Sequence, residues 1–125
     1  MILAQSAERG MNMVCRNVLI GTLVLAVIVV GTLAQAADLV EIPLTIENHR
    51  FAPEEITVKA GASFVLVISN KDATAEEFES HDLRIEKVIP AGKTLRLRMP
   101  ALKKGTYGFV GDFNQSTAKG QIIAE

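Results

Sequence analysis

A short acidic segment in the middle of the chain carries the side chains best suited to binding a cation. Glu77 and Glu79 are two positions apart, and His81 follows two positions later. Residues at this spacing point to the same face of a β-strand, so we expect these three side chains on one face and Phe78 on the other. Carboxylate oxygens together with an imidazole favour a hard or borderline ion, namely Fe(III), Fe(II), Cu(II) or Zn(II).

The spacing of this segment also limits what it can do alone. Side chains at positions i and i+2 stand about 7 Å apart, so a single ion needs a further ligand from a neighbouring strand or loop. Glu76, Glu77 and Glu79 also fit a plain solvated strand face, and His81 beside Asp82 also fits a turn. Both interpretations stay open. A metal site of this kind would lose affinity at acidic pH, because its ligands must be deprotonated.

The sequence carries no recognisable catalytic or nucleic-acid-binding motif. It has no G-x-S-x-G motif and no glycine-rich phosphate loop. Ser80-His81-Asp82 contains the residue types of a catalytic triad, but adjacent side chains point in divergent directions. With 13 basic and 14 acidic residues, the chain has a net charge of −1 and no basic excess to neutralise phosphates. We expect no catalytic residues and no nucleic-acid partner.

The N-terminal segment has the pattern of an export signal. Arg9 and Arg16 precede an uncharged apolar run, Val18 to Val30, and Ala34-Gln35-Ala36 supplies small residues for a signal peptidase. We predict a signal peptide at residues 1–36. The alternative is an uncleaved anchor, because the apolar stretch is at the short limit of what spans a bilayer. Both interpretations place the domain outside the cytoplasm, in the periplasm, with membrane contact only through this segment.

The predicted domain, residues 37–125, contains no cysteine, because the single cysteine is Cys15. No disulfide and no thiolate ligand can form in it. Its hydrophobic residues alternate with polar ones, which predicts short strands with one buried face. Pro43 argues for an edge position at the first strand, and the unbroken apolar run from Phe64 to Ile68 predicts a strand buried on both faces. Such strands, separated by turn residues, predict an all-β sandwich.

Three segments resemble the cupredoxin family in the order that the family shows. Phe51 to Gly61 has the pattern F-x-P-x-x-I-x-V-x-A-G, Gly105 to Phe109 has G-x-Y-x-F, and Gly120 to Ile123 resembles the closing strand. The resemblance implies a cupredoxin-like Greek-key β-sandwich following the signal segment. In such a sandwich, Tyr107 would form a tyrosine corner with the chain just before it.

The ligands of blue copper are missing from the matching positions. The places of the family's cysteine, histidine and methionine hold Gly111, Asn114 and Ala118, and that of its early histidine falls at about Glu77. Blue-copper electron transfer needs a thiolate–copper bond. We therefore expect no type 1 copper.

A smaller group within the family shows a closer likeness. Glu77 to Ser80, Glu86 to Pro90 and Ala118 to Gly120 resemble the EfeO-type and related stand-alone periplasmic domains. These domains accompany Ftr-type iron permeases and replace sulfur and imidazole ligands with acidic ones. The resemblance implies a role with iron or copper in bacterial iron uptake, with an Ftr-type permease or a periplasmic iron-binding protein as partner.

The family likeness also suggests the remaining ligands. Asp112 and Asn114 fall in the loop that carries the copper ligands in cupredoxins, and His49 falls in a loop that reaches the same end. We therefore predict a metal site of Glu77, Asp112 and His49, supported by Glu79 and Asn114. A ferroxidase activity is implied only by the resemblance. The alternative function is a metal-free interaction domain that kept the cupredoxin sandwich, because a fold alone does not define a function.

Overall fold

The computed structural model describes residues 37–125, and the predicted signal segment lies outside the described residues. Residues 37–125 form nine strands and one short 3₁₀ turn, η1. The elements are β1 (Val40–Glu47), β2 (Arg50–Ala52), β3 (Glu55–Val58), β4 (Phe64–Asn70), β5 (Glu76–Ser80), β6 (Ile85–Ile89), β7 (Thr94–Met99), β8 (Gly105–Gly111), η1 (Asp112–Asn114) and β9 (Lys119–Ala124). Within this range, no helix is long and apolar enough to cross a membrane.

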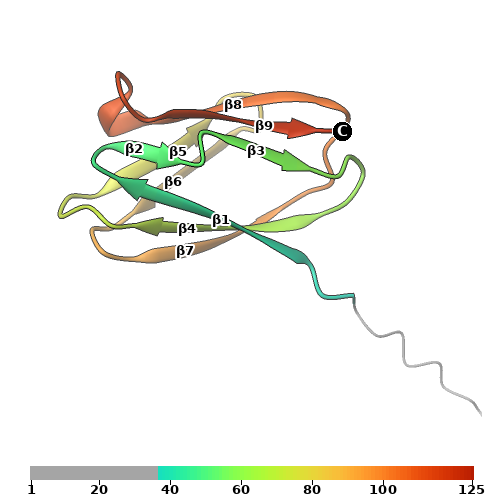
Figure 1. Cartoon of the computed structure of the whole chain (residues 1–125), viewed down its shortest axis with the longest axis horizontal. Helices are drawn as coiled ribbons and strands as arrows, with labels where there is room; N and C mark the ends of the chain where they lie inside the picture. Colours follow the sequence, from blue (N-terminus) through green and yellow to red (C-terminus); the bar gives the residue numbers. More distant parts are fainter. Residues whose placement is uncertain (1–36) are drawn as a thin grey trace, which may run out of the picture. The chain divides into compact units, whose positions relative to one another are not determined.

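The strands form two sheets that pack face to face (Figure 1). One sheet has the order β2-β1-β4-β7 and the other has the order β3-β9-β8-β5-β6. β1 pairs with β4 and β3 pairs with β9 in parallel, whereas the other pairs are antiparallel. The chain therefore crosses repeatedly between the sheets, and the predicted all-β, cupredoxin-like sandwich is confirmed.

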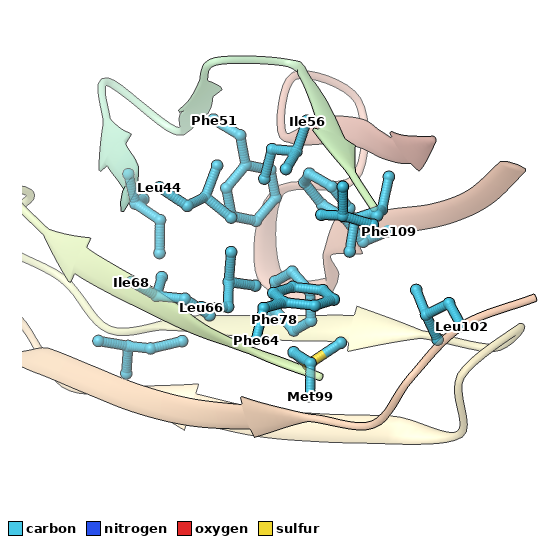
Figure 2. Close-up of a cluster of buried hydrophobic side chains, with 14 of the residues drawn as sticks. Leu44, Phe51, Ile56, Phe64, Leu66, Ile68, Phe78, Met99, Leu102 and Phe109 are labelled. Atoms are coloured by element: carbon cyan, nitrogen blue, oxygen red, sulfur yellow. The ribbon is translucent and has the colours of Figure 1, made fainter. Parts of the chain in front are cut away.

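Aromatic and branched side chains from both sheets fill the space between them (Figure 2). Phe109 lies at the centre, with ring centroids 5.0 Å from Phe51 and 5.1 Å from Phe78. Each strand contributes alternate residues, as a period of two requires. The prediction that Phe64 to Ile68 is buried on both faces was wrong, because Val65 and Val67 are only half-buried. Among the described residues, no third layer covers the outside of this sheet.

The strand pairing shows where Pro43 lies in the sheet. β1 is not an edge strand, since it lies between β2 and β4. However, β2 pairs only with Thr45 to Glu47, so Pro43 has a ladder partner on one side only, at Val67 of β4. A proline is tolerated there because no neighbour needs its missing N–H.

The tyrosine corner is confirmed, because the Tyr107 hydroxyl donates a hydrogen bond to the Lys103 carbonyl at 2.8 Å.

Three connections meet at one end of the sandwich, at the left of Figure 1. They are the β1–β2 turn, the β4–β5 connection and the β8–β9 loop that contains η1. This end holds His49, Asp112 and Asn114, whereas β5 leads away from it toward Glu79 and His81.

Candidate functional site

A buried carboxylate lies where β5 meets the β8–β9 loop. The side chain belongs to Glu76, which is only 1% exposed. Its Oε1 accepts hydrogen bonds from the backbone N–H groups of Glu77 and Phe113, both at 3.0 Å, and its Oε2 accepts one from Asn114 Nδ2 at 2.6 Å. A carboxylate can be buried at tolerable cost only when donors surround it in this way.

Gly111 and Ala118 leave the room that this carboxylate occupies. A Cβ built on Gly111 would lie 2.7 Å from Glu76 Cδ and 2.6 Å from the Ala118 Cβ. The Gly111 N–H donates to the Ala118 carbonyl at 2.9 Å, which holds the two sides of the loop together. The three positions that correspond to the family's cysteine, histidine and methionine therefore meet in space, and a carboxylate lies against them.

The acid at this place is Glu76, whereas the sequence placed the fourth position at about Glu77. Phe78 is fully buried in the core, so Glu76, two residues before it, also points inward and Glu77 points outward. The sequence predicted that Phe78 points to the opposite face from Glu77, and its aromatic side chain was the signal that could have identified Glu76 as the inward acid.

A second group of acids lies on the outer face of the same sheet. Glu79 shares this face with Glu77, is 9% exposed, and has its Oε1 3.2 Å from His81 Nε2. The Asp112 carboxyl group is near enough to Glu79 to raise the pKa of Glu79. Glu86 lies directly opposite Glu79 on β6. We call Glu79, Asp112 and His81 the outer acidic group.

The environment of Glu79 favours a proton or a cation. Burial raises the pKa of Glu79, and so do the hydrogen bond to Asp112 and the negative charges of Asp112 and Glu86, while His81 lowers it. Two adjacent carboxylates repel each other unless a proton or a cation lies between them. Open depressions of about 470 and 380 Å³ border Glu79 and His81 on either side, so solvent and ions reach them.

The remaining predicted ligands lie elsewhere. His49 is in the β1–β2 turn, where its N–H donates to Asp72 Oδ2 at 2.9 Å and its Nδ1 lies 3.5 Å from the same oxygen. Asn114 is hydrogen-bonded to Glu76. Within residues 37–125, no three His, Cys, Asp or Glu side chains are gathered closely enough to hold a metal ion. The predicted five-residue set is therefore divided: His49 lies against Asp72, Asn114 against Glu76, and Asp112 near enough to Glu79 to raise its pKa.

Residues 20–124 match the sequence model of the cupredoxin-like domain, and the chain therefore belongs to this family. The uncharacterized protein RP394 of Rickettsia prowazekii (strain Madrid E) is 41% identical over 86 residues, which cover 69% of each chain.

Solved structures show the same fold. Auracyanin A, a blue copper protein of Chloroflexus aurantiacus, has a TM-score of 0.61 at 15% identity, over 70% of this chain and 100% of its own. The metal-binding domain of the Cu(I)-exporting P-type ATPase CopA of Streptococcus pneumoniae D39, solved with Cu(I), has a TM-score of 0.61 at 14% identity, over 73% of this chain and 99% of its own.

The residues present do not fit a type 1 copper ion. Such a centre needs a thiolate, imidazoles and a weak axial ligand, but Gly111 and Ala118 have no ligating atom and Asn114 offers only an amide. The space beside them is filled by the Glu76 carboxylate, whose oxygens already accept three hydrogen bonds. The domain has the cupredoxin fold without the chemistry of a blue copper protein.

Proposed function

We propose that this chain is an exported, cupredoxin-like metal-binding protein that holds iron or copper on carboxylate oxygens and assists bacterial iron uptake. The observation that carries the proposal is the 3.2 Å separation of His81 Nε2 from Glu79 Oε1, with the Asp112 carboxyl group near enough to raise the pKa of Glu79. A cation between the two acids would relieve their repulsion, and an imidazole beside them adds a nitrogen ligand.

Binding at the outer acidic group would require a modest closure. The side chain of His81 is 88% exposed, so it can turn toward an ion without disturbing the core. Glu79 lies on β5 opposite Val110 of β8, and Asp112 begins η1 two residues after Val110, so the two acids come from separate elements. Two carboxylates and one imidazole suit a borderline or hard ion better than the soft Cu(I) ion.

Sequence features support the proposed location and partner. The signal pattern at residues 1–36 supports a periplasmic location. The segments that resemble EfeO-type domains support an Ftr-type iron permease, or a periplasmic iron-binding protein, as the partner. The proposal contains no redox step. It concerns holding and passing on an ion.

Calorimetric titration of the purified protein with Cu(II), Zn(II) and Fe(III) citrate tests the proposal. Micromolar or tighter binding is expected, and both Glu79→Gln and Asp112→Asn should abolish it. Glu77→Gln is the matched control, because Glu77 shares the strand face but has no part in the acid pair. Binding that survives both substitutions would refute the outer acidic group as the site, and no binding of any of the three ions would refute a metal-binding function.

The interaction-domain alternative has one observation in its favour. Phe113 is 52% exposed at the same end of the sandwich, while its backbone N–H is held by Glu76. An exposed aromatic side chain on a fixed turn is suited to insertion into an apolar pocket of a partner. A pull-down from a periplasmic extract, in which Phe113→Ala loses a partner that the unaltered protein retains, would support this alternative.

A further inference from the structure

We infer that the Glu76 carboxylate is the structural replacement for a metal ion in this domain: it ties β5 to the β8–β9 loop. Glu76 makes hydrogen bonds within its own strand and to η1, which is distant in sequence. One bond returns to its own strand at Glu77, and two reach η1 at Phe113 and Asn114, 37 and 38 residues further along the chain.

The 3₁₀ turn η1 lacks a capping side chain of its own. The turn starts after Gly111, which has no side chain to accept a hydrogen bond from the first N–H groups. Glu76 Oε1 accepts the N–H of Phe113 in that first turn. A residue from another strand therefore does what a local cap residue does in other turns, and it fixes the turn to β5 at the same time.

The residues beside the Glu76 carboxylate, Gly111 and Ala118, are small enough to leave room for it. Gly111 has φ −88° and ψ 105°, a conformation that any residue adopts, so its backbone does not require a glycine. The requirement is steric, because a Cβ there would lie 2.9 Å from Glu76 Oε2. Ala118, which is fully buried, borders the same space. The combination of Glu76, Gly111 and Ala118 forms one packing unit.

Loss of the hydrogen bonds between Glu76 and η1 would destabilise the domain. Glu76 is 1% exposed, so water cannot replace a missing partner, and a buried charged group that loses a hydrogen bond destabilises the fold more than an exposed one does. A metal ion at this place would have to break these hydrogen bonds to reach the oxygens. Glu79 of the outer acidic group points to the other face of the sheet, whereas Asp112 begins the same turn that Glu76 holds, so loosening of this turn would also affect Asp112.

The test is denaturant unfolding in EDTA, with Glu76→Gln and Asn114→Ala compared with Glu77→Gln. Glu77 is the next residue and points outward, so its substitution controls for loss of one acid. Glu76→Gln and Asn114→Ala are each expected to raise the unfolding equilibrium constant about 10- to 100-fold. Their effects should fall short of additive in the double variant, since both remove the same hydrogen bond. Glu77→Gln should change the unfolding equilibrium constant less than about threefold.

Equal stability of Glu76→Gln and Glu77→Gln would overturn the inference. If Glu76→Gln does not fold, the comparison of Asn114→Ala with Glu77→Gln decides, because Asn114 is only half-buried and its loss leaves two donors on the carboxylate. Repeating the measurement with Zn(II) separates this inference from the proposed function. A Zn(II)-induced gain in stability that is lost in Glu76→Gln but retained in Glu79→Gln would make Glu76 a ligand and refute the structural role. The absence of any Zn(II) effect in the unaltered protein would count against the proposed function alone.

Discussion

The carboxylate of Glu76 lies so close to the α-carbon of Gly111 that no side chain fits between them. A Cβ on Gly111 would be 2.7 Å from Glu76 Cδ. Gly111 stands at the place of the cysteine that binds copper in the family, and Glu76 fills the space beside it. A residue larger than glycine at position 111 would therefore require a residue smaller than glutamate at position 76.

Gly111→Ala should destabilise the domain by about 2 kcal/mol, because an added methyl group in a packed site forces its neighbours to move. Gly108→Ala on the same strand is the control, since its nearest neighbour would be Asp82 Oδ2 at an ordinary 3.8 Å. Its effect should stay within about 0.5 kcal/mol. Urea unfolding measures both. A Gly111→Ala variant as stable as Gly108→Ala would mean that the Glu76 site is looser than described.

The cupredoxin-like sandwich could be predicted from the sequence, whereas the arrangement of the site could not. Alternation and the motifs around Phe51, Tyr107 and Ile122 identified the fold, because each depends on local periodicity and turn residues. The inward residue of β5 depends on strand register, and a shift of one residue exchanges Glu76 for Glu77. Both are acidic, so the composition of the segment does not distinguish them.

The prediction of His49 as a ligand depended on contacts that no local pattern reveals. The β1–β2 turn could be expected to reach the site end, but Asp72 of the β4–β5 connection binds the N–H groups of Asn48 and His49, 24 and 23 residues away. Those hydrogen bonds direct His49 to Asp72. Long-range pairing of this kind requires the fold itself.

His49→Ala should therefore leave metal affinity unchanged within about twofold, because the ring lies against Asp72 and not beside Glu79 or Asp112. Asp72→Ala should cost about 1–2 kcal/mol in the free energy of unfolding, since two backbone hydrogen bonds to the turn are lost. Calorimetric titration of the first variant and urea unfolding of the second check these values. A His49→Ala variant with tenfold weaker binding would return His49 to the ligand set.

Tyr107→Phe should destabilise the domain by about 1 kcal/mol through loss of its hydrogen bond to the Lys103 carbonyl. The ring stays in place, so packing is preserved. Thermal unfolding, with circular dichroism to confirm the sheet content, measures the change. A change below about 0.3 kcal/mol would show that water replaces the hydroxyl group.

The stability of the domain should depend on pH through Glu79. Its pKa is raised in the folded protein, above all by burial and then by the hydrogen bond to Asp112. Between the ordinary glutamate pKa and the raised value, the folded state holds a proton that the unfolded state releases. The free energy of unfolding should therefore fall as the pH rises through that interval.

Glu79→Gln removes this dependence, so the variant should be more stable than the unaltered protein at neutral pH and show a flatter pH profile. Urea unfolding at several pH values from about 4 to 8 measures the free energy of unfolding of this variant, and Glu77→Gln is the control. The groups that shift the pKa of Glu79 are Asp112, Glu86 and His81, and Asp82, Arg84 and Lys119 border the depressions beside it. A steeper profile in Glu79→Gln than in the control would contradict the raised pKa.

The most direct measurement is a crystal structure of the protein grown with Cu(II) or Zn(II), with anomalous scattering to locate the ion. The account requires a peak between Glu79 and Asp112, within coordination distance of His81, and an unchanged Glu76 with its three hydrogen bonds. An ion bound to Glu76 and Asn114, or crystals at saturating metal with no peak at the outer acidic group, would contradict it.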